Sequence, residues 1–228
     1  MEYDVAEAKD LYTAWQIALA TQSLQLLPGN ESVESILRTW DSNPGYPLVT
    51  VTVQGNSIQL YQRRFIDSNP NNTDASLWYV PISIATASNP NFNTTLPRLW
   101  LTSRSATTNV SDLNSGDWVI VNIQQSGYYR VNYDLENWNR IITTLLQTNF
   151  TFINRANRAQ LVDDSYTLAR YGVIDYSIPL RLTTYFTRES DFIAMFPFFQ
   201  ALAFLEPHLA NSPSYSNFVV RLPTTFLI

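Results

Sequence analysis

The hydrophobic period of this 228-residue chain changes twice, and each change limits the fold. Between residues 8 and 23 apolar side chains recur at the spacing of one helix face. From Leu48 to Gln54 polar and apolar residues alternate, as in a strand with one buried face. After Asp134 the helical spacing returns. The order predicts an α+β chain: short helices, an antiparallel β-sandwich, then an α-solenoid-like helical array.

Turn residues divide the chain at the same places, because Pro28-Gly29 and Pro44-Gly45 interrupt helices and Gly55-Asn56 suits a hairpin. We expect strands over residues 48–54, 57–65, 77–84, 98–102, 118–123 and 128–133. We expect helices over 8–23, over a short segment capped by Ser32, and around 138–146, 155–170, 179–186 and 196–205. These elements predict three segments, with boundaries near residues 42 and 134.

Composition excludes several classes of site. The chain has 14 basic and 19 acidic residues and no basic cluster beyond Arg63-Arg64, which argues against nucleic-acid binding. It has no cysteine, so disulfides and thiolate metal sites are excluded. It has one histidine, whereas a zinc site of the H-E-x-x-H type needs two. We therefore predict no catalytic residue, no metal ligand and no cofactor for this chain.

Neither end of the chain resembles a targeting or membrane segment. Residues 1–10 are polar and acidic, whereas a signal peptide begins with positive charge. No run approaches the ~20 apolar residues that span a bilayer. The longest apolar run, residues 192–205, contains Pro197 and Gln200, and we expect it to be a buried helix rather than a transmembrane segment.

Three groups of residues could form a site, and each has a plainer interpretation. His208 could be a ligand or a base, but without a second histidine we expect it to lie near helix-end carbonyls. Asp163 and Asp164 could be an acid/base pair, but adjacent helix residues point about 100° apart and should not share a face.

The third group, Tyr128, Tyr129 and Arg130, could bind a ligand through stacking or a cation–π contact. Strand alternation instead places Tyr129, Val131 and Tyr133 on one face and Tyr128, Arg130 and Asn132 on the other, and we expect one of the two faces to be core. We expect Arg130 to pair with a carboxylate at the junction of the strands and the helices.

Five N-x-[ST] sequences are candidate glycosylation sites if the protein is secreted. They are Asn30, Asn71, Asn93, Asn109 and Asn149. We expect all five in loops, turns or helix edges.

Four motifs carry a resemblance to a known family. They are Arg38-Thr39-Trp40 followed by residues 43–51, the pair Trp78 and Val80-Pro81, residues 127–134 with the sequence GYYRVNYD, and NRAQL at 157–161 with Asp164. In this order and spacing the chain resembles the aminopeptidase N family of zinc aminopeptidases over roughly residues 8 to 206.

The resemblance implies a role for each segment. Residues 1–42 would be the C-terminal helices of the catalytic domain, 43–134 the β-sandwich, and 135–228 the beginning of the C-terminal helical domain, in which Asp164 would be structural. The family's G-x-M-E-N and H-E-x-x-H segments are not in this sequence, so zinc belongs to the full-length family and this chain alone is expected to be inactive.

Partners and location follow only from the resemblance. Peptides would be substrates of the full-length enzyme, these segments would contact a catalytic domain, and the protein would be secreted or on the extracellular face of the plasma membrane. The ends, including Pro223, depart from the family pattern and suggest an internal fragment, a truncated isoform or an incomplete gene model. The alternative function is a stand-alone glycosylated binding or receptor module without enzymatic activity.

Overall fold

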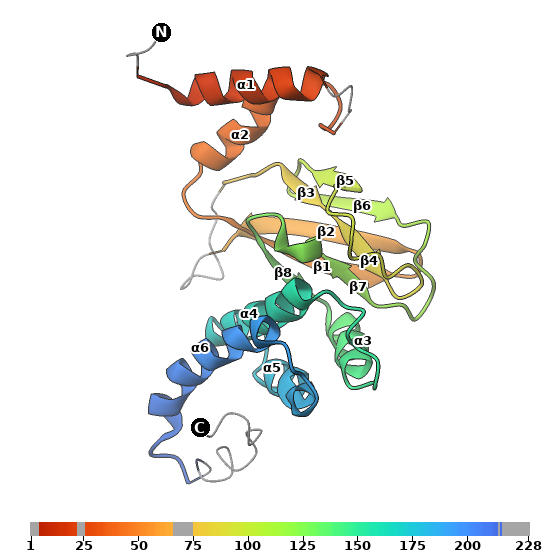
Figure 1. The fold of residues 1–228 in the computed structure, drawn as a ribbon, viewed down its shortest axis with the longest axis vertical. Coiled ribbons are helices and arrows are strands. Elements are labelled where there is room, and N and C mark those ends of the chain that lie inside the picture. The colour runs from red at the N-terminus through yellow and green to blue at the C-terminus, as the bar shows by residue number, and fades with distance from the viewer. Residues whose placement is uncertain (1–4, 22–25, 66–74, 214, 216–228) are drawn as a thin grey trace.

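The computed structural model describes residues 5–21, 26–65, 75–213 and 215. Figure 1 shows three tiers: two N-terminal helices, a middle layer of strands, and four C-terminal helices beyond the strands. The described part is thus a mixed α/β structure with six α-helices and small sheets. One hydrophobic cluster of buried residues runs through it, from Val49 in the strands to Phe198 in the last helix.

The N-terminal helices are α1, Ala8–Thr21, and α2, Val33–Asp41. Ser32 caps α2 as predicted, because its side chain accepts a hydrogen bond from the Ser35 N–H while Ser35 binds the Ser32 backbone in return. Residues 22 and 23 of the predicted first helix lie outside the described residues. The apolar face of α1 is exposed, since Leu11 is 48% and Trp15 49% accessible.

The largest sheet has the order β6-β2-β1-β8. Its strands are β1 (Pro47–Gln54), β2 (Ser57–Arg64), β6 (Ser105–Asn109) and β8 (Arg130–Tyr133). The β1–β2 hairpin turns at Gly55, which has a φ of 63°, as the sequence predicts. β8 runs parallel to β1, with Arg130 opposite Leu48, so this sheet is mixed rather than wholly antiparallel.

Two strand pairs complete the middle layer. β3 (Val80–Ile82) pairs with β5 (Leu99–Leu101), and β4 (Ile84–Thr86) pairs with β7 (Val119–Val121). The predicted strand 77–84 is therefore divided at Ser83. There the Ser83 carbonyl accepts the Asn122 N–H and its hydroxyl accepts the Ile123 N–H, so the chain passes from one partner strand to the next.

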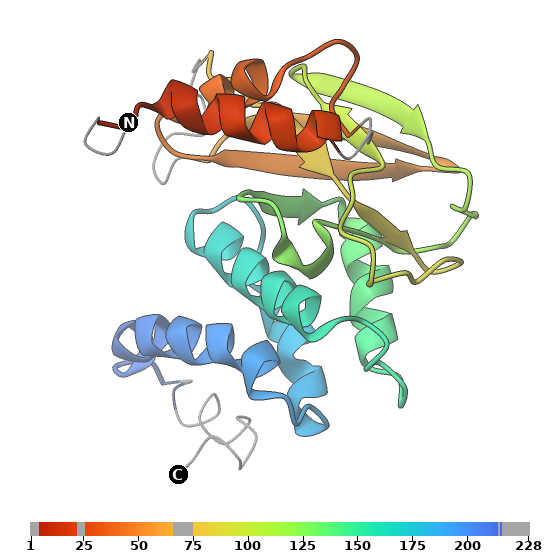
Figure 2. The same ribbon diagram turned by 45° about the horizontal axis from the view of Figure 1, so that its top comes forward.

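The C-terminal helices agree with most predicted positions. They are α3 (Leu135–Leu145), α4 (Arg155–Arg170), α5 (Ser177–Leu182), which continues into the 3-10 turn η2 (Thr183–Thr187), and α6 (Phe192–Leu209). Beyond α4, Gly172 has a φ of 70° and the Val173 N–H donates to the Leu168 carbonyl, a common helix ending. Figure 2 shows α4 between the strands and α6.

The prediction that the last apolar helix is buried was wrong. Only Ala194, Phe198 and Leu205 of α6 are buried, whereas Phe192 is 62% and Phe196 47% exposed. By length and composition alone, α6 is the one helix among the described residues that could cross a membrane. That is weak support for a span, because the core helices of other proteins meet the same criteria.

Candidate functional site

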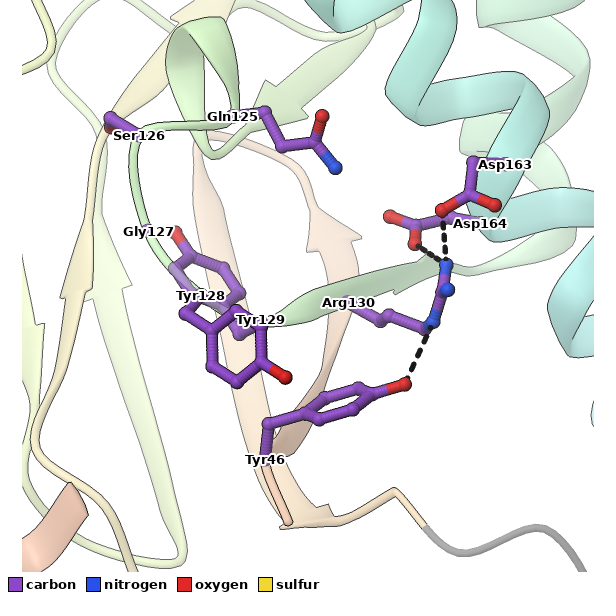
Figure 3. Close-up of a pocket in the computed structure, with 9 residues that line it drawn as sticks. All are labelled: Tyr46, Gln125, Ser126, Gly127, Tyr128, Tyr129, Arg130, Asp163 and Asp164. Carbon is purple, nitrogen blue, oxygen red and sulfur yellow. Dashed lines mark hydrogen bonds and ion pairs between the residues drawn. The ribbon is translucent and has the colours of Figure 1, made fainter. Parts of the chain in front are cut away.

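The strand β8 and the helix α4 meet at a charged cluster on Arg130 (Figure 3). The Arg130 Nη1 donates to Asp163 Oδ2 at 2.7 Å and to Asp164 Oδ1 at 2.8 Å, and its Nε donates to the Tyr46 hydroxyl at 3.3 Å. Asp164 Oδ2 also accepts the Val131 N–H at 3.0 Å. The cluster therefore fixes the strand to the helix through both side-chain and backbone bonds.

This geometry confirms one expectation and corrects another. Arg130 pairs with carboxylates at the junction, as expected. The core face of the strand is the one that carries Tyr129, which is buried. The expectation that Asp163 and Asp164 point to separate faces was wrong in effect, because both reach the same guanidinium nitrogen. A long side chain that enters between two helix residues can contact both of them.

Burial controls the charges of the cluster. The Asp163 side chain is 39% exposed, that of Arg130 20% and that of Asp164 only 4%. Burial, reinforced by Asp163, raises the pKa of Asp164 to about 7, although Arg130 and the Val131 N–H favour its ionised form. Burial lowers the pKa of Arg130, but Asp164 and Asp163 more than offset this and its net pKa is raised.

A cavity of about 490 Å³ lies over this cluster. One side is formed by the helix carboxylates and the other by residues 125–127 and the rings of Tyr46 and Tyr128 (Figure 3). These two rings meet edge to face with centroids 5.2 Å apart, and Tyr128 is 71% exposed. The cavity is open and mixed in polarity, with an excess of negative over positive groups in its lining.

The loop before β8 is held in a strained conformation. Asn122, Gln124 and Gln125 have φ values of 66°, 55° and 54°, which are uncommon for residues other than glycine. Asn157 of α4, which is fully buried, stabilises the loop by accepting the Gln124 N–H at 2.8 Å and donating to the Asn122 carbonyl at 2.9 Å. The side chain of Asn157 thus joins the loop to the helix.

Gly127 lies in the same loop and packs directly against the buried ring of Tyr129. A Cβ at this position would lie 2.4 Å from Cε1 of Tyr129, so no other residue fits without movement. The Gly127 N–H also donates to Asn122 Oδ1. Sequence reasoning missed this arrangement, since the segment Asn122–Gln125 contains neither glycine nor proline to signal it.

A second buried ion pair was also missed. Arg158 Nε donates to Glu189 Oε2 at 2.7 Å, and the two side chains are only 5% and 2% exposed. Arg158 stands in the NRAQL motif, but its partner lies 31 residues further along the chain. Only the return of the chain after η2 brings the two residues together.

The structure places His208 in the last turn of α6, with Nδ1 2.7 Å from the Phe204 carbonyl. This is the helix-end environment that the sequence predicts. Among the described residues no group of three histidine, cysteine, aspartate or glutamate side chains is arranged to hold a metal. The side chains of the described part therefore do not fit zinc.

Four of the candidate glycosylation asparagines lie on the surface. Asn30, Asn93, Asn109 and Asn149 are all exposed, and each is in or beside a turn, a strand end or a helix edge. Asn71 lies outside the described residues. Exposure is what an attached glycan requires, but it does not by itself show modification.

Comparisons with known proteins agree with the motifs. The ERAP1-like C-terminal domain model matches residues 118–226. The chain is 34% identical to aminopeptidase N of Plutella xylostella over 94% of its own length and 21% of the relative. It is 30% identical to the mouse thyrotropin-releasing hormone-degrading ectoenzyme, over 99% of this chain and 22% of the relative. It is 34% identical to the membrane alanyl aminopeptidase of Manduca sexta, over 81% of this chain and 19% of the relative.

The chain thus spans about a fifth of the length of the relatives it matches. The matches cover all three tiers of the structure, including the charged junction between β8 and α4. On this similarity, the chain belongs to the aminopeptidase N family of zinc aminopeptidases.

Proposed function

We propose that this chain is a non-catalytic portion of a zinc metalloaminopeptidase that removes N-terminal amino acids from peptides. Its role is that of a scaffold and a wall of the chamber in which the peptide is cleaved. The observation that carries the proposal is the 34% identity to an aminopeptidase N over 94% of the chain.

The proposal gives each tier a place in the whole enzyme. Residues 1–42 are the last helices of the catalytic domain, 43–134 are a β-sandwich, and 135–228 begin a superhelical array. The exposed apolar face of α1, with Leu11 and Trp15, is then the surface that contacts the rest of the catalytic domain. In this proposal the zinc is held by other residues of the full-length enzyme.

The relatives also suggest a location. The names of two of them describe an ectoenzyme and a membrane aminopeptidase. We place this protein on the extracellular face of the plasma membrane or in the secreted fraction, with glycans on the candidate asparagines. Mass spectrometry of the protein from its native source, before and after deglycosylation, tests Asn30, Asn93, Asn109 and Asn149 directly.

A chimera tests the scaffold role. Aminopeptidase N of Plutella xylostella, with its matching segment replaced by this chain, should keep hydrolysing an alanyl chromogenic substrate. The isolated chain should show no such activity with or without added zinc. Arg130→Ala in the chimera should lower the yield of folded enzyme, while Arg38→Ala, which alters an exposed ion pair, should not. Activity of the isolated chain would overturn the proposal.

The alternative, a stand-alone glycosylated binding or receptor module, has its support in the same exposed asparagines and in the open cavity beside Tyr128. It predicts a monodisperse chain that binds a partner saturably without any other domain. Sedimentation of the isolated chain separates the two functions: the scaffold role predicts association through the exposed faces of α1 and α6, and the module role predicts a monomer.

A further inference from the structure

The cavity over Arg130 is not explained by the ion pairs beneath it. Those pairs join β8 to α4 and would do so equally well in a closed junction. Instead about 490 Å³ remains open between the helix carboxylates and the loop of residues 125–127. The groups around this space define the kind of molecule that it suits.

The lining has one more negative than positive formal charge. Two carboxylates, Asp163 and Asp164, share the single guanidinium of Arg130. Asp164 is nearly enclosed, and its second oxygen is already bound to the Val131 N–H. Asp163 is 39% exposed, and the nearest donor to its Oδ1 is the Thr167 hydroxyl at 3.5 Å, which leaves acceptor capacity on that oxygen.

An aromatic wall and an amide face the carboxylates. The rings of Tyr46 and Tyr128 stand edge to face at 5.2 Å, and Tyr128 offers a largely exposed ring. In Figure 3 the Gln125 carboxamide points toward the helix side of the same space. Ring faces attract organic cations, and a carboxylate and an amide oxygen can accept hydrogen bonds from them.

We propose that this cavity binds a guanidinium or alkylammonium group, carried by a small amine or by a basic side chain of another protein. Asp163 accepts its N–H groups and Tyr128 covers its apolar side. A bare divalent metal ion suits the space less well, because Arg130 already occupies one oxygen of each carboxylate. The site does not depend on the peptidase activity proposed above.

The titration of the cluster supports the same ligand. The charged or titratable residues that line the space are Asp163, Asp164, Arg130, Tyr46, Tyr128 and Tyr129. Burial raises the pKa of Asp164 to about 7. A bound cation favours ionised Asp164, so binding should release a proton, and it should strengthen as the pH rises from 6 to 8.

Calorimetric and NMR titration of the full 228-residue chain tests the site with ethylguanidinium as the probe. We expect saturable binding, at least tenfold weaker in Asp163→Asn and severalfold weaker in Tyr128→Ala. Glu136→Gln, which alters an exposed ion pair on α3, is the matched control and should bind as the wild type does. Neutral propylurea has a similar shape and should not bind.

Three results would overturn the proposal: binding of propylurea as strong as that of ethylguanidinium, unchanged binding in Asp163→Asn, or preferential binding of acetate at Arg130. If Asp163→Asn does not fold, Tyr128→Ala and Gln125→Ala decide the question, because both leave the ion pairs intact. Acetyl-Gly-Arg-Gly-amide separates the two sources: tighter binding than ethylguanidinium identifies a basic side chain, and equal or weaker binding identifies a free amine.

Discussion

Helices α4 and α6 pack against each other (Figure 2). α4 is polar and mostly buried, whereas α6 is apolar and has few buried residues. Eleven of the sixteen residues of α4 are buried, among them Asn157, Arg158 and Asp164. Three of the eighteen residues of α6 are buried. Composition alone would predict that the apolar helix α6 is buried and that the polar helix α4 is exposed.

The difference shows what polar burial requires. Each buried polar side chain of α4 just named has partners from another element: the loop before β8 for Asn157, the end of η2 for Arg158, and β8 for Asp164. Such groups are tolerated in an interior because their hydrogen bonds are made. One side of α6 packs against α4 through residues such as Phe198 and Leu205. The apolar residues Phe192, Ile193 and Phe196 on the rest of the helix remain accessible in the described structure.

The largest expected effect is the loss of a buried charge partner on α4. Arg158→Ala leaves Glu189, 2% exposed, without its guanidinium, and should lower the free energy of unfolding by about 3–5 kcal/mol. Urea unfolding measures the change. The control is Arg38→Ala, whose ion pair is exposed and should contribute less than about 1 kcal/mol. Similar losses in the two variants would show that burial does not distinguish these pairs.

The next largest effect concerns the strained loop that α4 stabilises. Asn157→Ala removes two buried hydrogen bonds and leaves the Gln124 N–H and the Asn122 carbonyl without their partner. We expect a loss of about 2–4 kcal/mol in unfolding free energy, together with faster amide exchange in residues 122–127. Asn139→Ala, which removes an exposed bond from Arg181, should change stability by less than about 1 kcal/mol. Unchanged exchange in the loop would refute the role given to Asn157.

A smaller effect, visible only as a pH dependence, concerns Asp164. Burial raises its pKa in the folded protein to about 7 from an ordinary value near 3.8, so the folded state holds the proton more tightly than the unfolded state. The stability that protonation of Asp164 adds to the folded state is therefore fully present below about pH 4 and is lost as the pH rises through 7. Between pH 4 and 7.5 the free energy of unfolding of the wild type should fall by on the order of a few kcal/mol relative to that of Asp164→Asn. A relative gain over that range would contradict the sign.

Sequence patterns predicted the parts of this comparison that depend on neighbours along the chain. The period located α4 and α6, strand alternation put Tyr129 and Arg130 on opposite faces, and Arg130 was expected to meet a carboxylate. These predictions succeeded because a side chain's direction follows from its place in a regular element.

The patterns did not predict what lies opposite each face. The last apolar helix was expected to be buried, but a period identifies an apolar face without identifying a partner for it. β6 was missed because it is an edge strand with only Ala106 apolar. The pairing of Arg158 with Glu189 and the strained turn at Asn122 depend on contacts distant in sequence, which no local pattern contains.

The smallest expected change in stability is that of Phe196→Ala on α6, and Phe198 on the same helix is its matched comparison, since the two residues differ in position but not in chemistry. Phe198 is 3% exposed and packs against Tyr166 and Phe186, so Phe198→Ala should lower the free energy of unfolding by about 3–5 kcal/mol. Phe196 is 47% exposed, and Phe196→Ala should lower it by less than about 1 kcal/mol. Phe196→Ala should instead reduce self-association in sedimentation velocity, because it removes part of an accessible apolar face. Equal losses of stability in the two variants would mean that α6 is covered in the folded chain, and the contrast with α4 would then disappear.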